Sequence, residues 1–388
     1  MTRLPSALPD DVVLLKISVV LGLLAGLVLS PKLWLSSRLY PLTPVWSFFR
    51  SPSSPGDHII YFALIALLIS ACVIPRREIL IGVFTLLALL ALQDQSRWQP
   101  WFYQYVVMLL AIALAGSTRP SAALNTCCLI VAAIYIWSGF AKLNPNFVNV
   151  IFPSLLEPFM GWRLAPPRWL VHDLAFVAPL LECVAGVGLL TRRFRKVAVY
   201  GAIAMHILIL MAIGPLGSRF NVVVWPWNFA MIAFLLILFL RRADNPGPQE
   251  IIWGKGFAFQ KVALLLFGLM PALSAFNLWD HYLSSALYSG NRNSGLVYVS
   301  DAVFDRLPDA IEDHVYEVGE GRNELDINDW SFGELNVPSY PEIRIYRNVA
   351  RQICGYAVDG AGVELVVKGK LAFIDGNRRS VYTCAALR

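Results

Sequence analysis

Charged residues are scarce in this sequence. Only 15% of its 388 residues are Asp, Glu, Lys or Arg, and 57% are hydrophobic. Soluble domains average about 25% charged and about 45–50% apolar residues. The shortage of charge is concentrated in the first 280 residues, and the remainder has the composition of an ordinary soluble domain. The composition excludes a chain that is soluble throughout, and it predicts a polytopic membrane protein with an appended domain.

Motifs for binding metals or nucleic acids are also missing. The six cysteines form no Cys-x-x-Cys motif, and no residues show the spacing of a metal site. Four of the cysteines lie in apolar runs, where this residue usually acts as a small hydrophobe. The net charge is +6, but the cations sit in short loops such as 192–196, which is typical of membrane topology signals. We therefore expect no metal and no nucleic-acid partner.

Apolar runs long enough to cross the roughly 30 Å hydrocarbon core recur about nine times. They lie near residues 12–30, 58–74, 79–93, 101–116, 122–141, 172–190, 197–215, 220–240 and 258–278. The first is long for a signal peptide and is followed by a poor cleavage site, so we interpret it as a transmembrane helix. Residues 144–171 are apolar but interrupted by five prolines, which predicts an interfacial or re-entrant segment that roofs any site at Lys142.

The arginines and lysines between the runs predict the orientation. With the N-terminus in the cytoplasm, the inside loops contain Arg119 and the clusters at 76–77, 192–196 and 241–242, the last with Lys255. The outside loops are longer and have no dense cluster, so the positive-inside rule favours this orientation. Nine spans would place the C-terminal domain outside the membrane, whereas an even number would reverse that conclusion. We expect a multi-pass protein of the cell inner membrane.

The chain therefore divides into a membrane domain, residues 1–280, and an extracytoplasmic α+β domain, residues 284–388. Within the latter, patterning predicts strands at 296–299, 363–367, 371–374 and 380–384, and a helix over 341–354. The turn between the last two strands would pass through Asp375, Gly376 and Asn377. Cys354 and Cys384 are either a disulfide, which an oxidising compartment permits, or two buried thiols.

Four polar side chains interrupt the apolar runs. Lys142 ends one run, Glu182 and His206 lie in the middle of two consecutive runs, and Asn228 follows Trp225-Pro-Trp227. Ionisable groups in a membrane are costly and usually functional. Glu182 either pairs with His206 or only fixes helix packing. Lys142 either extends to the outer interface or acts, when desolvated, as a general base toward a weak acid such as a quinol.

A second polar cluster covers residues 93–101. Asp94 and Arg97 either form a clamp at a helix end or line the mouth of the cavity that contains Lys142. With Asn228 they are the candidate substrate-binding residues.

Short segments of the first 280 residues resemble vitamin K-dependent gamma-carboxylases and their bacterial relatives, the HTTM (horizontally transferred transmembrane domain) proteins. The segments that carry the resemblance are residues 134–148 around Lys142, residues 94–98, residues 181–186 and His206. The resemblance implies that Lys142 is the catalytic base, supported by Glu182 and His206, and that a vitamin K-like quinol is the cofactor. The chain departs from the carboxylases in its shorter tail and in the lack of a histidine at 78–84, so carboxylation of protein glutamates is not expected.

Three functions remain open at this point. The first is a quinol-dependent membrane enzyme that binds a lipid or quinone. The second is a DoxX-like, non-catalytic accessory subunit of a redox or maturation system, whose tail docks an extracytoplasmic protein. The third is a proton-coupled transporter that uses Glu182 and His206 as a relay, although no inverted repeat is evident. Convergence of Lys142, Glu182 and His206 on one cavity with a lateral opening to lipid would favour the enzyme. Dispersal of the three groups, or pairing of each with its own neighbour, would favour the accessory subunit.

Overall fold

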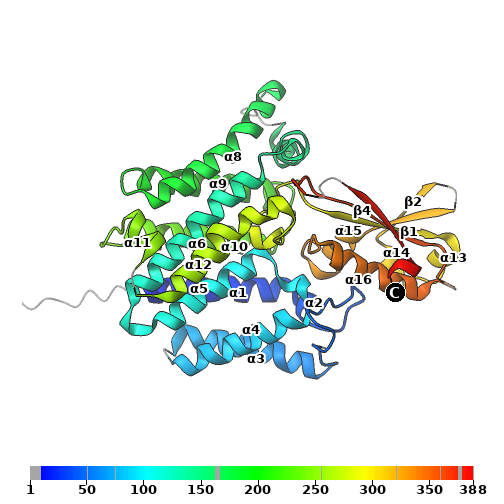
Figure 1. The fold of residues 1–388 in the computed structure, drawn as a ribbon, viewed down its shortest axis with the longest axis horizontal. Helices are drawn as coiled ribbons and strands as arrows, with labels where there is room; N and C mark the ends of the chain where they lie inside the picture. Colours follow the sequence, from blue (N-terminus) through cyan, green and yellow to red (C-terminus); the bar gives the residue numbers. More distant parts are fainter. Residues whose placement is uncertain are drawn as a thin grey trace, which may run out of the picture.

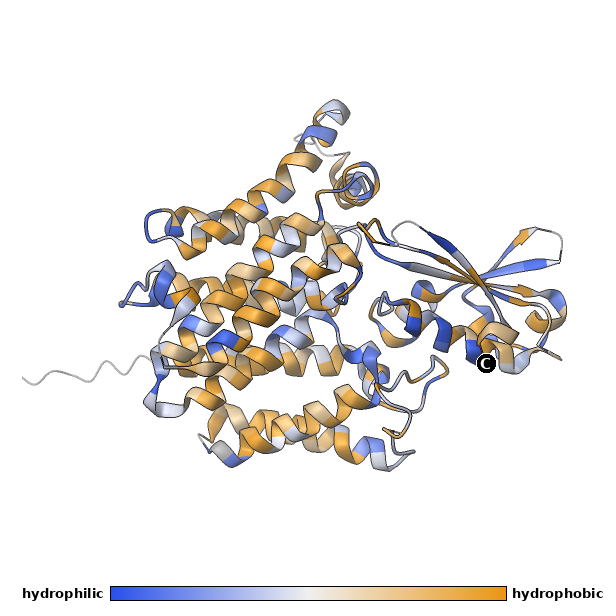
Figure 2. Ribbon diagram, viewed as in Figure 1, coloured by the Kyte–Doolittle hydropathy of each residue, from blue (hydrophilic) through white to orange (hydrophobic). Residues whose placement is uncertain are grey.

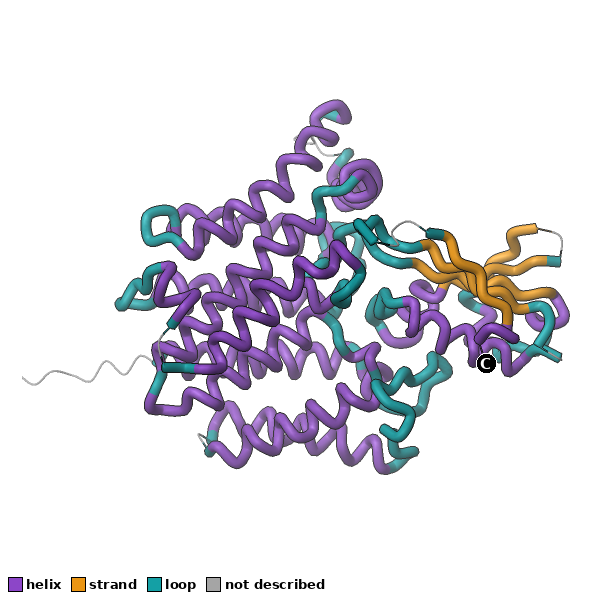
Figure 3. The backbone as a smooth tube through the Cα atoms, in the orientation of Figure 1, coloured by secondary structure: helices purple, strands orange, loops and turns teal. Residues whose placement is uncertain are grey.

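The computed structural model describes residues 10–49, 51–74, 76–161, 167–254, 256–319, 321–358, 360–374 and 378–387. It consists of a bundle of long helices and a small domain containing one antiparallel sheet (Figure 1). All strands of the described residues lie in that small domain (Figure 3). The predicted fold class, a helical membrane bundle with a C-terminal α+β domain, is confirmed.

The bundle is built from apolar helices that run through most of its width (Figures 1 and 2). They are α1 (Asp11–Leu29), α3 (Gly56–Val73), α4 (Arg77–Gln93), α5 (Pro100–Ala115), α6 (Pro120–Ala141), α8 (Arg168–Leu190), α9 (Arg195–Ile213), α10 (Val224–Leu235) with η5 (Leu236–Arg241), and α12 (Ala258–Ala263) with η6 (Leu264–Leu269) and η7 (Met270–Phe276). Within the described residues, eight helical segments are long and apolar enough to cross a membrane. The protein is therefore a multi-pass membrane protein.

One of the nine predicted segments, the run at 79–93, forms the shorter helix α4, which has 17 residues. Its partner α3 begins on the side of the small domain, where Asp57 accepts a hydrogen bond from the backbone N–H of Ser36 at 2.7 Å. α4 returns to that side, because Gln95, two residues beyond its end, accepts a hydrogen bond from Arg344 of the small domain at 2.7 Å. α4 thus runs antiparallel to α3 and back to the same side of the bundle. Its 17 residues are at the lower limit of the length that crosses a membrane.

Hydrophobic residues predominate along most of the bundle helices (Figure 2), and many of the large ones are exposed on the outside of the bundle. On α8, for example, Leu181 and Val184 are more than 60% exposed, as is Val197 on α9. Large apolar side chains in such numbers on the outer surface are normal where the solvent is lipid. α6 is the most deeply buried of the spanning helices, so its polar residues face other helices.

Short helices connect the long ones. They are α2 (Pro31–Trp34), η1 (Gln95–Arg97), η2 (Gly116–Thr118), η3 (Phe147–Ile151), α7 (Phe152–Leu156), η4 (Glu157–Phe159), α11 (Pro248–Trp253) and η8 (Tyr282–Ser284). The described part of residues 144–171 contains no continuous spanning helix outside α8, as its prolines predict.

The small domain has five strands in the order β2-β3-β1-β4-β5. They are β1 (Ser294–Ser300), β2 (Val315–Gly319), β3 (Arg322–Asp326), β4 (Val363–Lys368) and β5 (Arg379–Thr383). In the central strand, Val297 lies opposite Leu325 on one side and Leu365 on the other, and all three are buried. The helices are α13 (Asp301–Phe304), α14 (Asp309–Glu312), α15 (Ile327–Leu335), α16 (Ile343–Ile353), η9 (Cys354–Tyr356) and α17 (Cys384–Leu387).

One predicted strand is wrong, and two strands were not predicted. Residues 371–374 form a loop that packs on the bundle, where the backbone N–H of Phe373 donates to Ala275 at 2.8 Å. Contacts with the bundle replace the hydrogen bonds that a neighbouring strand would make there. The apolar composition of residues 371–374 was therefore not enough to predict a strand. β2 and β3 were missed because they contain little alternating apolar sequence. The predicted turn at 375–377 lies outside the described residues.

A disulfide joins Cys354 and Cys384, whose Cα atoms are 5.7 Å apart. Of the two alternatives that the sequence left open, the structure has the bond rather than two thiols. It ties the last helix of the chain, α17, to the end of α16.

The small domain is held to the bundle through the segment that follows α2. Glu334 on α15 accepts hydrogen bonds from the backbone N–H groups of Leu39 and Tyr40, at 2.6 and 2.7 Å. Gln352 on α16 donates to the carbonyl of Leu39 at 2.8 Å, and Asn336 donates to that of Leu29 at 2.7 Å. These side chains pair with backbone groups at the end of α1 and in the segment after α2. The small domain therefore provides hydrogen-bond partners for individual backbone groups of the bundle.

Glu342 lies in this same contact region. Its carboxylate accepts from the backbone N–H of His281 at 2.9 Å. Burial and the neighbouring carboxylate of Asp280 raise the pKa of Glu342 to about 7, because both disfavour its charged form.

We predict that Glu342 makes the protein less stable as the pH rises. The folded pKa of about 7 exceeds the unfolded value of about 4.3, so the stabilisation is complete below about pH 4.3 and is lost as the pH rises through about 7. The melting temperature in detergent should therefore fall between about pH 5.5 and about pH 8. In Glu342→Gln the melting temperature should depend less on pH. The exposed Glu317→Gln is the control, and an unchanged pH profile in Glu342→Gln would refute the assignment.

Candidate functional site

The candidate site is built where α6 and α8 approach each other closely. A Cβ atom at Gly139 of α6 would lie 2.6 Å from the backbone oxygen of Pro179 on α8, and one at Gly186 of α8 would lie 2.8 Å from the carbonyl oxygen of Ala132. Small residues at such crossings let membrane helices pack backbone against backbone. This approach brings residues 40 positions apart in the sequence within hydrogen-bonding distance.

Lys142 and Glu182 form an ion pair across this crossing. The Nζ atom of Lys142 lies 2.6 Å from a carboxylate oxygen of Glu182 and 2.6 Å from the hydroxyl oxygen of Ser138. Their side chains are only 14% and 9% exposed. Lys142 caps the end of α6, yet its side chain runs back along the helix toward Ser138, one turn earlier, as helical side chains tend to do. It therefore does not extend outward to the interface.

His206 belongs to a second pair of contacts beside the first. Its Nδ1 lies 2.7 Å from Oδ1 of Asn228 on α10, and its Nε2 lies 2.6 Å from the hydroxyl of Tyr135 on α6. The amide nitrogen of Asn228 donates to the carbonyl of Val224 at 2.8 Å, which fixes the direction of the amide. Its oxygen must then accept from Nδ1, so the imidazole proton lies on Nδ1 and Nε2 accepts from Tyr135. The predicted pairing of Glu182 with His206 is wrong, because each has another partner.

Both groups line one small cavity. Its volume is about 60 Å³, and its polar lining comes from Tyr135, Ser138, Lys142, Glu182, His206, Asn228 and Tyr288. A volume of that size holds about two water molecules, and it is far below the roughly 300 Å³ at which small-molecule sites begin. The polar residues converge, as an enzyme would require, but each has a protein partner and the space between them does not admit a quinol ring.

Asp94 and Arg97 lie elsewhere, and neither lines this cavity. Both side chains are fully buried. Asp94 pairs with Arg38 at 2.5 Å and accepts from the Thr43 hydroxyl at 2.8 Å. Arg97 donates to the carbonyls of Leu33, Leu90 and Trp34, at distances of 2.7 to 3.0 Å.

Burial alone would raise the pKa of Asp94, but Arg38 and Arg97 hold it below its usual value. This cluster pins the segment after α2 against η1. The interpretation of Asp94 and Arg97 as the mouth of the Lys142 cavity is wrong. The two residues form the alternative, a clamp at the end of a helix, with 3.9 Å between Nε of Arg97 and a carboxylate oxygen of Asp94.

The sequence interpretation missed three lining residues. Tyr135 and Ser138 lie seven and four positions before Lys142, on the same helical face, so spacing would have revealed them. Tyr288 carries no local signal; it reaches the cavity from the segment that leads into β1, and Asn221 donates to its hydroxyl at 2.6 Å. Residues 287 and 288, rather than the described part of 144–171, cover the cavity on that side.

No group of three or more His, Cys, Asp or Glu side chains among the described residues is arranged to hold a metal ion.

We predict that Gly139→Ala separates α6 from α8. The added methyl group would overlap the Pro179 carbonyl, and such overpacking costs about 1–3 kcal/mol. Thermal unfolding of the purified protein in detergent measures the loss. Gly201→Ala on α9 is the matched control, since no other helix lies within 4 Å of the added Cβ there. Equal effects of the two substitutions would show that the close approach is unimportant.

Part of the chain is similar to a known protein family. The family described as "Methylamine utilisation protein MauE" matches residues 120–224, which run from α6 through α9 to the first residue of α10. No curated protein and no solved structure matches the chain. The match overturns the resemblance to vitamin K-dependent carboxylases and HTTM proteins, which is wrong. It covers less than half of the chain, and it contains Lys142, Glu182 and His206 but not Asn228.

Proposed function

We propose that this protein is a non-catalytic membrane accessory subunit of a redox or maturation system, whose tail presents a docking surface outside the membrane. The observation that carries the proposal is the complete pairing of Lys142, Glu182, His206 and Asn228 around a cavity of about 60 Å³. A site that binds a substrate needs open space and unpaired groups, and neither is present. The partial match to a family named for methylamine utilisation is compatible with an accessory role.

In this proposal the polar cluster specifies how the helices pack. An ion pair out of water is stable only when both members are present, and removing one member typically costs about 3–5 kcal/mol. Replacing both by apolar residues of similar size is often neutral. The hydrogen bonds of His206 to Tyr135 and Asn228 connect α6, α9 and α10, and such interhelical bonds contribute about 0.6 kcal/mol on average. Together they favour one arrangement of α6, α8, α9 and α10.

The second candidate function is proton transfer across the bundle. The cavity places the Lys142–Glu182 pair and the His206–Tyr135 pair on the walls of a space for about two waters. Ordered water there would connect the carboxylate to the imidazole, and intramembrane Glu and His are common members of proton relays. This arrangement favours a proton-coupled transporter over a quinol-dependent enzyme.

One pair of variants separates these functions. Lys142→Met alone should lower stability by about 3–5 kcal/mol, and Lys142→Met with Glu182→Leu should recover most of that loss. The accessory role further predicts that the double variant restores the phenotype of a deletion strain to the wild-type level. A stable double variant that fails to complement would refute the accessory role and support proton transfer.

The orientation is part of the proposal. Eight described helical segments are long enough to cross a membrane, and we count the shorter α4 as a ninth crossing. With that count, the arginine clusters and the disulfide between Cys354 and Cys384 favour a cytoplasmic N-terminus and an extracytoplasmic tail. We predict that alkaline phosphatase fused to the C-terminus is active and that the same fusion at Asn245 is inactive, because the loop after Arg241-Arg242 should lie inside. An inactive C-terminal fusion, with an active one at Asn245, would reverse the orientation.

A further inference from the structure

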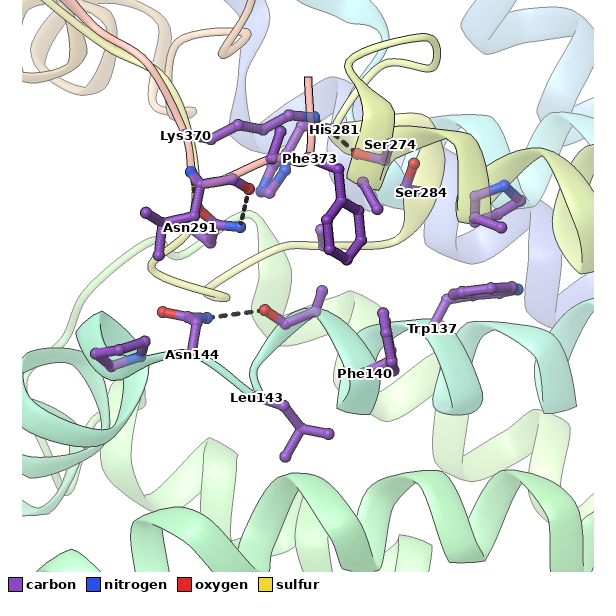
Figure 4. Close-up of a pocket in the computed structure, with 18 residues that line it drawn as sticks. Trp137, Phe140, Leu143, Asn144, Ser274, His281, Ser284, Asn291, Lys370 and Phe373 are labelled. Carbon is purple, nitrogen blue, oxygen red and sulfur yellow. Dashed lines mark hydrogen bonds between the residues drawn. The ribbon is translucent and has the colours of Figure 1, made fainter. Parts of the chain in front are cut away.

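A second, larger cavity lies where the membrane helices meet the small domain (Figure 4). Its volume is about 400 Å³, within the range of small-molecule sites. Trp137, Phe140 and Leu143 at the end of α6 form an apolar side, and Ser274, His281 and Lys370 form a polar end. None of these residues belongs to the Lys142 cavity.

Lys370 is the charged group of this cavity. The residue is only 5% exposed, and its Nζ donates to the hydroxyl of Ser274 at 2.8 Å. No carboxylate among the described residues lies within ion-pair distance of it. The nearest acids, Asp280 and Glu342, have other partners: Arg344 for Asp280, and the backbone N–H of His281 for Glu342. An ammonium group has three donors, so Lys370 can still bind an anion, and burial without one is costly.

The other polar groups add no competing charge. Nε2 of His281 lies 3.1 Å from the hydroxyl of Ser289. Burial, together with the nearby Lys370 and Arg292, lowers the pKa of His281 to about 3, so the imidazole is neutral at physiological pH. No acidic side chain lines the cavity. Its polar end therefore favours a single negative group.

The cavity is held in shape before any ligand binds. The Asn291 side chain bonds both backbone polar groups of Leu371, accepting from its N–H at 2.7 Å and donating to its carbonyl at 3.0 Å. Asn293 accepts from the N–H of Lys370 at 2.9 Å, and Asn277 donates to the carbonyl of Ile374 at 2.6 Å. The bonds of Asn291 and Asn293 fix the loop after β4 to the segment that leads into β1, and the bond of Asn277 fixes it to the end of η7 in the bundle. A ligand would therefore pay little to order the site.

The apolar side opens to the surroundings of the bundle. Phe140 is 55%, Leu143 37% and Phe373 81% exposed. α6 ends at Ala141 and η7 at Phe276, both on the side of the small domain, so the cavity lies where spanning helices leave the hydrocarbon core. Lipid head groups occupy that depth, with their chains beside the helices.

We propose that this cavity binds an anionic membrane lipid, with its phosphate beside Lys370 and Ser274 and its chain along Phe140, Leu143 and Phe373. The proposal goes beyond the accessory function and does not depend on it. A bound lipid would join the bundle to the small domain, because Phe140 and Leu143 belong to the bundle, whereas Lys370 and Phe373 belong to the small domain.

The test uses the full chain, delipidated in a mild detergent, with lipid binding followed by native mass spectrometry. The probes are phosphatidylglycerol, phosphatidylcholine of the same chains, and glycerol phosphate. We expect phosphatidylglycerol to bind at least tenfold more tightly than phosphatidylcholine, and Lys370→Met to abolish that preference. Lys370→Arg should keep it, as should Lys368→Met, which removes an equal charge from an exposed position two residues away.

A further variant guards against misfolding of Lys370→Met. Phe373 is exposed, so Phe373→Glu should fold normally while repelling an anionic lipid at the rim, and binding of phosphatidylglycerol should fall at least tenfold. Equal binding of the two lipids, or a preference that survives both Lys370→Met and Phe373→Glu, would overturn the proposal. So would saturation of the site by glycerol phosphate, which indicates a soluble anion, or co-purification of a quinone in place of phospholipid.

Discussion

The organisation of the bundle depends on the electrostatic cost of Lys142. An ammonium group buried between helices is tolerated only when an opposite charge and hydrogen-bond acceptors are close. Here Glu182 and Ser138 provide both, at 2.6 Å each. That geometry requires α6 and α8 to touch, and the glycines at 139 and 186 make the contact possible. The ion pair and the small residues are therefore two parts of one constraint on helix packing.

The same pairing explains why the cluster is poorly suited to binding a substrate. Every strongly polar group around the small cavity has a protein partner, and the remaining space suits water rather than a ring system. The ligand site that we propose lies instead at the junction of the bundle with the small domain. There Lys370 is buried without an ion pair, beside exposed aromatic side chains.

The junction is more than a point of attachment. Glu334 and Gln352 of the small domain bind backbone groups of the segment after α2, and Asp94 and Arg97 hold that segment from the other side. The small domain, this segment and η1 thus form a continuous set of hydrogen bonds. Any partner that displaced the small domain would have to replace them, since buried polar groups left unpaired are costly.

The sequence by itself determined the class of the protein. Long apolar runs can be accommodated only as membrane helices, so the bundle and the helix α16 were predictable from local composition and period. It also identified Lys142, Glu182, His206 and Asn228 as unusual, because their cost depends on the apolar sequence around them. Only the tertiary structure decided their partners, which lie up to 71 positions apart. It also decided that Asp94 and Arg97 form a separate clamp and that residues 371–374 are a loop rather than a strand. The physical reason is that hydrogen-bond partners are set by how helices pack. The apolar sequence around a lysine shows that burying its charge is costly, but it does not show which distant carboxylate offsets that cost.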